Sequence, residues 1–131
     1  MRGTKPTLRP DDAAFQQHLE APAWLDADAG AEWARVMPEL VQRRILTAAD
    51  LGTLENYCLC IGQVRQCQRV IAEKGLTVSL MKGPRKHPAV QIQADAMTRA
   101  RLLAAELGLT PVSRSRPSIR DDGDDDSILD Q

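Results

Sequence analysis

A chain of 131 residues has room for one modest domain but not for two well-packed ones. Only four residues are aromatic, so the core has to be aliphatic and rich in alanine, which favours helices over a β-sandwich. No apolar run approaches the roughly 20 residues of a membrane span, and the N-terminus lacks a signal-peptide core. We therefore expect a soluble, all-α protein that stays where it is made.

The net charge of −1 conceals an asymmetry along the chain. Residues 121–131 carry six acids and no base, whereas residues 1–120 carry all 17 Lys and Arg against 12 acids. A mildly basic body followed by an acidic tail is compatible with nucleic-acid binding.

The N-terminal residues 1–25 contain three prolines and no sustained apolar period. This composition predicts an extended basic arm, whose end Trp24 and Leu25 would anchor. From residue 26 to residue 111 the sequence predicts one helical core that also mediates oligomerisation. Beyond it, residues 112–131 lack a periodic apolar face and predict a disordered tail, first rich in Arg and then in Asp.

The first helix of the core should begin after Asp26, a good N-cap residue. Pro38 falls inside its apolar pattern and predicts either a kink or two short helices that meet. The residues that form this pattern at helical spacing are Trp33, Met37, Leu40 and Val41.

A second, longer helix should follow the capping-box-like segment 47–50 and end at Gly75, about 40 Å further on. Its apolar residues recur at steps of three and four, which suits a single coiled-coil-like seam. They are Leu51, Leu54, Cys58, Ile61, Val64, Cys67 and Ile71.

Glycines and prolines interrupt the core at residues 75–87, where the sequence permits a small β-hairpin that turns at 82–84. Pro88 should then open a third helix with His87 as its N-cap, and this helix should end at Gly108. Its face includes Met97 and many alanines. We expect the second and third helices to form an antiparallel helical hairpin joined by a short basic loop.

Catalytic signatures are absent from the sequence: it has no phosphate-binding glycine loop, no Gly-x-Ser-x-Gly and no His-Glu-x-x-His. His18 and His87 lack partners at metal-ligand spacing, and the acidic run 121–126 is more typical of a solvated segment than of a cation site. The three cysteines match neither a zinc knuckle nor a redox pair and predict buried thiols in a reducing compartment. We expect no enzyme activity, no cofactor and no metal.

Residues 2–117 contain a series of short motifs: Arg2-Gly3-Thr4-Lys5-Pro6, Trp33 with Pro38-Glu39-Leu40, Leu46-Thr47-Ala48-Ala49-Asp50, Tyr57-Cys58, His87-Pro88-Ala89, and Leu107-Gly108-Leu109-Thr110-Pro111 before Ser113-Arg114-Ser115-Arg116. In their order and spacing, these motifs resemble the small terminase subunits of tailed bacteriophages.

That resemblance implies a non-catalytic component of genome packaging that assembles as a ring in the cytoplasm of the infected bacterium. It would recognise double-stranded viral DNA and would recruit and stimulate the large subunit, which supplies ATPase and nuclease. The assembly contacts that we predict are Leu51, Leu54, Ile61, Val64, Ile71, Met97 and Leu103. For docking of the large subunit we predict Ile128 and Leu129, the apolar residues of the acidic tail.

Candidate DNA contacts come from charge alone, because basic side chains neutralise phosphates and release counterions. They are Arg2, Lys5, Arg9, Arg43, Arg44, Lys82, Arg85 and Lys86. A helix-turn-helix is disfavoured, since residues 48–55 at the start of the second helix offer two acids and no base. The alternative function is a small helical adaptor that binds only protein.

Overall fold

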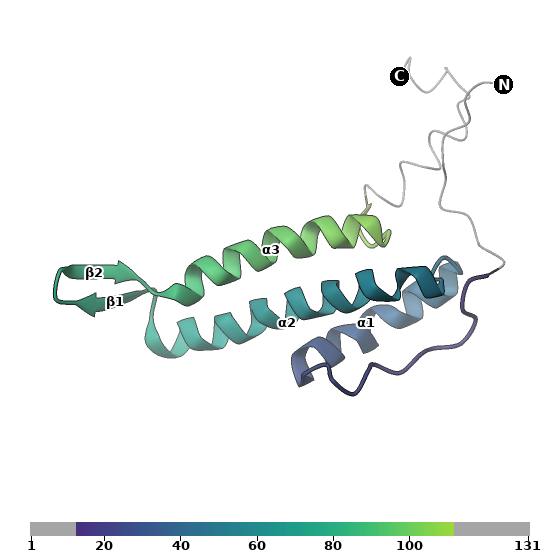
Figure 1. Ribbon diagram of the computed structural model, residues 1–131, viewed down its shortest axis with the longest axis horizontal. Helices are drawn as coiled ribbons and strands as arrows, with labels where there is room; N and C mark the ends of the chain where they lie inside the picture. Colours follow the sequence, from purple (N-terminus) through teal and green to yellow (C-terminus); the bar gives the residue numbers. More distant parts are fainter. Residues whose placement is uncertain (1–12, 112–131) are drawn as a thin grey trace, which may run out of the picture.

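The computed structural model describes residues 13–111, in which helices and one β-hairpin follow each other in an elongated arrangement (Figure 1). The elements are α1 (Ala27–Arg43), the 3-10 turn η1 (Ala48–Asp50), α2 (Leu51–Lys74), β1 (Thr77–Leu80), β2 (Gly83–Lys86) and α3 (Pro88–Glu106). The mostly helical fold is therefore confirmed, together with the small antiparallel β-hairpin that the sequence permits. None of the helices within residues 13–111 is long and apolar enough to cross a membrane.

Helix α1 begins as predicted, because the side chain of Asp26 accepts a 2.8 Å hydrogen bond from the Ala29 amide. It does not divide into two short helices, since it continues through Pro38 to Arg43. Proline removes one helical N–H, but Pro38 lies on the exposed side of α1, where water can hydrogen-bond to the carbonyl left without a donor. The helix ends at Arg44, which adopts the left-handed conformation with φ 56°.

Helices α2 and α3 form the predicted antiparallel hairpin, and their ends follow the local signals (Figure 1). Gly75, with φ 88°, ends α2, and His87 caps α3 by accepting a 3.0 Å hydrogen bond from the Ala89 amide. Gly108, with φ 75°, follows the end of α3. The β-hairpin turns at Met81–Lys82, one residue earlier than predicted, so Gly83 and Pro84 belong to β2.

The apolar residues of α2 do not form the single seam that the sequence predicted. Between Cys58 and Cys67 they recur in three successive steps of three residues, and each such step falls about 60° short of a full turn. Cys58 and Cys67 are both buried, but they lie on opposite sides of α2. Leu54 and Cys58 join the core that contains α1, whereas the Val64 carbonyl accepts a hydrogen bond from Gln93 of α3. Helix α2 therefore has one face for each neighbouring helix.

Helix α1 covers only part of the α2–α3 hairpin. It lies along the part of α2 that starts at Leu51, and the end of the hairpin that carries β1 and β2 extends beyond it (Figure 1). The largest fully buried side chains therefore gather around α1 and the start of α2. They are Met37, Leu40, Leu46, Leu54, Glu32 and Cys58.

Residues 13–25, assigned to the arm from the sequence, lie against this core. The Phe15 amide donates to the Leu46 carbonyl at 2.8 Å, and the indole of Trp33 donates to the Leu19 carbonyl at 2.8 Å. Leu25 packs against the core as expected, but Trp24 does not anchor the segment, since it is 62% exposed. The described part of the arm is thus held by backbone hydrogen bonds and by Phe15 and Leu19.

Candidate nucleic-acid interface

The β-hairpin places three of the predicted DNA contacts on one short projecting element. Strands β1 and β2 pair from Thr77 with Lys86 to Leu80 with Gly83, so Lys82 lies in the turn. Neighbouring residues of a strand point to opposite faces, which places Arg85 and Lys86 on opposite faces of the hairpin. A 2.7 Å hydrogen bond from the His87 amide to the Leu76 carbonyl closes the hairpin at its base.

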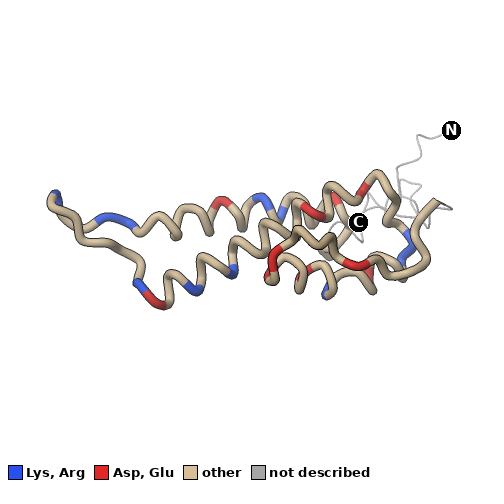
Figure 2. The backbone as a smooth tube through the Cα atoms, turned by 60° about the horizontal axis from the view of Figure 1, so that its bottom comes forward, with Lys and Arg blue, Asp and Glu red and all other residues tan. Residues whose placement is uncertain are grey.

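All three basic side chains are exposed, and the segment around them contains no acid. Residues 74–94 include Lys74, Lys82, Arg85 and Lys86 but neither Asp nor Glu. Figure 2 shows Lys and Arg at this end of the molecule, while most of the Asp and Glu residues lie nearer the other end. We call β1, β2 and their turn, with Lys82, Arg85 and Lys86, the basic hairpin. Its local charge is uniformly positive, which is the electrostatic property that phosphate binding requires.

Arg43 and Arg44 lie at the other end of the protomer and do not join the basic hairpin. The guanidinium of Arg43 donates to the Gly108 carbonyl and to the Glu39 carboxylate, so it links α1 to the end of α3. Arg44 is exposed in the left-handed position after α1. The length of α2, about 36 Å for its 24 residues, separates these arginines from the hairpin.

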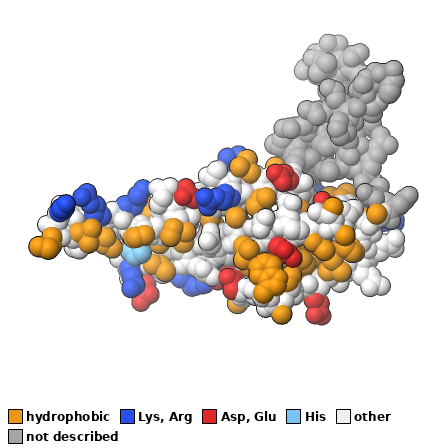
Figure 3. Space-filling view, viewed as in Figure 1, with side chains coloured by type: hydrophobic (Ala, Val, Ile, Leu, Met, Phe, Trp, Pro, Cys, Tyr) orange, Lys and Arg blue, Asp and Glu red, His pale blue; other side chains and the backbone are white. Residues whose placement is uncertain are grey.

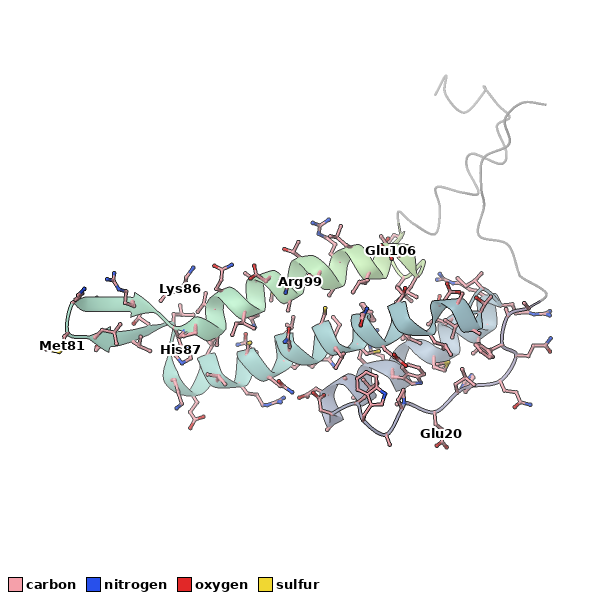
Figure 4. All side chains as sticks on the ribbon, in the orientation of Figure 1. Glu20, Met81, Lys86, His87, Arg99 and Glu106 are labelled. Atoms are coloured by element: carbon pink, nitrogen blue, oxygen red, sulfur yellow. The ribbon has the colours of Figure 1, made fainter. Side chains whose placement is uncertain are left out.

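The remaining predicted contacts fall outside the described residues, and further basic residues lie on α2 and α3. Arg2, Lys5 and Arg9, and likewise Ile128 and Leu129, lie outside the described residues. Sequence reasoning did not select Lys74, at the end of α2 next to the hairpin, although its position before Gly75 places it there. It also omitted Arg99 (Figure 4) and Arg101, which are both exposed on α3 and form no ion pair within residues 13–111.

The residues predicted to mediate assembly fall into two groups. Leu54 is fully buried in the core of its own protomer, and Leu51, Ile61 and Leu103 pack against that core. Val64 and Ile71 are partly buried, whereas Met97 is 50% exposed. Met97 therefore offers the most apolar surface to a second copy, and Leu54 offers none.

A buried carboxylate that sequence reasoning missed joins α1 to α2. Glu32 is fully buried and accepts hydrogen bonds from the Tyr57 hydroxyl at 2.6 Å and from Arg35 at 2.6 and 2.9 Å. Arg65 of α2 approaches it at 3.4 Å. Its position three residues after Ala29 and four before Val36 places an acid on the apolar stripe of α1, and this pattern was the available signal.

Glu32, Tyr57, Arg35 and Arg65 form a cluster, called the Glu32 cluster, in which the carboxylate is charged and hydrogen-bonded. Burial by itself would raise the pKa of Glu32, but hydrogen bonds from Arg35 and Tyr57, with the charges of Arg35 and Arg65, outweigh it and lower the pKa. Burial, together with the bond to Glu32, raises the pKa of Tyr57 to about 12. At neutral pH the ionised Glu32 carboxylate therefore accepts a hydrogen bond from the protonated Tyr57 hydroxyl. The cluster joins α1 to α2 and has a structural role.

The remaining polar features of residues 13–111 do not form a catalytic or metal site. A pocket of about 390 Å³ next to Tyr57 contains Arg35 and Arg43, but each of these arginines is paired with a glutamate. No group of three or more His, Cys, Asp or Glu side chains in the described part of the chain is arranged to hold a metal ion. Burial raises the pKa of Cys58 to about 12, so this thiol is a poor nucleophile.

These features define a small helical protein that, within residues 13–111, concentrates exposed basic side chains on its β-hairpin and exposes apolar side chains on α3. The sequence profile of the family described as "Phage terminase, small subunit" matches residues 29–124, and the chain belongs to this family. The predicted resemblance is thereby confirmed. No curated protein and no solved structure matches the chain significantly. Membership implies a role in phage DNA packaging, in a family whose members are generally the non-catalytic component of the terminase.

Proposed function

We propose that this protein binds double-stranded phage DNA through the basic hairpin, assembles as a ring and recruits the large terminase subunit. It would act in the cytoplasm of the infected bacterium, and the large subunit would supply ATPase and nuclease activity. The observation that carries the proposal is the concentration of exposed Lys and Arg on a projecting, acid-free hairpin in a member of a DNA-packaging family.

Electrostatics supports DNA as the partner of the hairpin. Lys82 and Arg85 form no ion pair within residues 13–111, and Lys86 contacts only the neutral amide of Gln91, at 2.9 Å. Each of these cations is therefore available to neutralise a phosphate and release its counterion. A ring would repeat the same hairpin around an axis and would strengthen the summed positive potential.

The exposed apolar residues of α3 support ring assembly. Ile92 and Met97 are 46% and 50% exposed and lie five residues apart, which is about 140° around a helix. They consequently flank, on opposite sides, the strip of α3 that packs on α2. A ring needs two different contact surfaces on each protomer, one for each neighbour, and this arrangement provides an apolar residue on both sides.

Recruitment of the large subunit is proposed from the sequence of the tail. Ile128 and Leu129 follow a dense acidic run, and short apolar anchors in a charged segment are typical of peptides that order on binding. Both residues lie outside the described part of the chain.

A salt titration of duplex DNA binding separates this function from that of a protein-only adaptor. The wild-type protein should shift a duplex of about 30 base pairs at 50 mM salt, and log affinity should fall linearly with log salt concentration. Light scattering on the same sample should give a mass several times that of the 14.4 kDa chain. A monomer that binds no DNA at the lowest salt concentration would contradict the proposal and favour the adaptor.

A further inference from the structure

The tip of the basic hairpin carries large apolar side chains where a turn normally carries polar ones. Met81 is fully exposed and Leu80 is 55% exposed, and Figure 4 shows Met81 at the far end of the hairpin, away from the helices. Tight turns favour Gly, which adopts positive φ without strain, and Asn, Asp and Ser, whose side chains hydrogen-bond to the local backbone. Folding of the hairpin therefore gives no reason for two exposed aliphatic residues at this position.

The hairpin holds the backbone of these two residues in a defined position. Leu80 pairs with Gly83 across the turn, and Gly83 has a φ of 111°, which a residue with a side chain rarely adopts. At the base, the hydrogen bond from His87 to Leu76 joins the hairpin directly to the ends of α2 and α3. Met81 therefore lies at the far end of this part of the protomer, with Leu80 directly before it and Lys82 directly after it in the chain.

Positive charges surround the apolar tip. Lys82 directly follows Met81, and Arg85 and Lys86 lie behind it on opposite faces of the hairpin. Figure 3 shows hydrophobic side chains at this extremity with Lys and Arg side chains immediately beside them. Apolar residues flanked by cations are the chemistry by which proteins insert a wedge between base steps while they contact the adjacent phosphates.

We propose that Leu80 and Met81 form a wedge that enters the minor groove of duplex DNA, partially unstacks one base step and kinks the helix. Neither side chain has a strong hydrogen-bonding group with which to read base edges in the major groove, so their contribution is to unstacking. Lys82, Arg85 and Lys86 then hold the phosphates on either side of the kink. The inference rests on the proposed DNA binding by the basic hairpin and adds deformation of the DNA to it.

Flexible steps and mismatches should consequently be preferred binding sites. Unstacking costs less where the step is already poorly stacked, so binding should select DNA by deformability rather than by hydrogen-bonded sequence. We expect the wild-type protein to bind a duplex with a central two-base mismatch about tenfold more tightly than the perfect duplex, because tenfold corresponds to only about 1.4 kcal/mol of a larger unstacking cost.

The test compares wild-type protein with the double variant Leu80→Ser/Met81→Ser and the single variant Met81→Ser. End-to-end fluorescence transfer on a 30-base-pair duplex reports bending, and 2-aminopurine at the central step reports unstacking. Wild-type protein should produce a bend of roughly 20–90° and a rise in 2-aminopurine fluorescence. The double variant should lose both signals and the preference for the mismatch, but should keep the salt dependence because its cations are intact.

The matched control is Leu102→Ser, which removes an aliphatic side chain that is 53% exposed on α3 and distant from the tip. It should behave as wild type in both assays. Bending or unstacking that survives in the double variant would overturn the wedge, as would a change in oligomer mass in Met81→Ser, which would show that the tip contacts protein. Wild-type protein that binds the duplex without bending it would overturn the wedge alone, whereas absence of all duplex binding would overturn the proposed function as well.

Discussion

The Tyr57 hydroxyl donates a 2.6 Å hydrogen bond to the Glu32 carboxylate in the interior between α1 and α2. An unpaired buried carboxylate would be strongly unfavourable, and Glu32 avoids this through Tyr57 and the two guanidinium groups of Arg35 and Arg65. Because Tyr57 and Arg65 belong to α2, whereas Arg35 belongs to α1, the carboxylate has its full set of partners only when α1 is docked on α2 in this register. The cluster thus fixes the position of α1 on the helical hairpin.

The first prediction concerns this cluster. Tyr57→Phe leaves a buried charge short of one donor and should lower the free energy of unfolding by about 1–3 kcal/mol, as measured by denaturant titration. The matched control is Leu102→Ala, at an exposed position on α3, which should change stability by less than about 0.5 kcal/mol. A Tyr57→Phe protein as stable as wild type would show that Arg35 and Arg65 alone satisfy Glu32.

The same cluster predicts a pH dependence of stability. The pKa of Glu32 in the folded state lies below its ordinary value of 4.5, so the unfolded chain binds the proton more tightly. Glu32 therefore stabilises the fold fully above pH 4.5, and this contribution is lost as the pH falls through the lower, folded-state pKa. Thermal midpoints measured from pH 7 to pH 3 should fall more steeply for wild type than for Glu32→Gln. Parallel curves would contradict the assigned role.

Gly62 provides a second test of how α1 docks on α2. A Cβ atom at Gly62 would lie 3.2 Å from the Ala29 amide nitrogen and 3.4 Å from the capping oxygen of Asp26. Gly62→Val should therefore displace the start of α1 and destabilise the protein by about 1–3 kcal/mol. Gly52→Ala is the control, since nothing lies within 4 Å of its Cβ position, and it should stabilise α2 by about 0.5–1 kcal/mol. Equal effects of the two substitutions would exclude close helix contact at Gly62.

Local signals predicted the helix ends, and long-range contacts determined what the sequence did not reveal. Asp26, Gly75 and His87 act on residues within four positions, so their roles can be read from neighbouring residues. The apolar stripe of α1 indicates that Glu32 is buried, but its partner Tyr57 is 25 residues away and cannot be identified from neighbouring residues. The two tryptophans differ in burial for the same reason: the indole of Trp33 is buried and donates a hydrogen bond to the distant Leu19 carbonyl, whereas Trp24 is exposed.

For the candidate interface too, the sequence predicted the local features and not the long-range contacts. Lys82, Arg85 and Lys86 cluster in the sequence, and a two-residue turn keeps them together in space. The sequence does not reveal whether the guanidinium of Arg43 is available to DNA. It donates a hydrogen bond to the Gly108 carbonyl, 65 residues away, and so it already contributes to the fold. Charge in a local segment is visible from sequence, but whether a charged group is already occupied depends on the tertiary structure.

The basic hairpin yields a prediction about DNA binding. The triple substitution Lys82→Ala, Arg85→Ala and Lys86→Ala should weaken binding to unrelated duplexes alike and flatten the salt dependence, because phosphate contacts carry no base information. Gel-shift titrations at several salt concentrations measure both effects. Arg99→Ala/Arg101→Ala removes exposed charges from α3 instead and serves as the comparison. If the triple variant keeps the wild-type affinity and slope, the site lies in the arm or at Arg43 and Arg44.

Assembly can be tested separately from folding at Met97. Since this side chain is 50% exposed, Met97→Asp should leave helicity and the thermal midpoint close to those of wild type. In a ring the carboxylate would be buried at a subunit contact without a partner, so light scattering should show a smaller species. Ile61→Asp is the contrasting variant, because Ile61 packs against the protomer core and its replacement should unfold the chain. A fully assembled Met97→Asp protein would place the contact elsewhere.

The final prediction concerns deletion of residues 118–131, which removes six acids together with Ile128 and Leu129. Helicity, thermal midpoint and oligomer mass should remain unchanged, because the core described above is built from residues between 14 and 109. DNA binding should hold or strengthen slightly, since the deletion removes negative charge that repels phosphate. Binding to the large subunit, and stimulation of its ATPase, should fall. The control is Ile128→Ser/Leu129→Ser, which keeps every acid: loss of stimulation in this variant assigns docking to the apolar pair, and full stimulation by the deleted protein would refute docking through the tail.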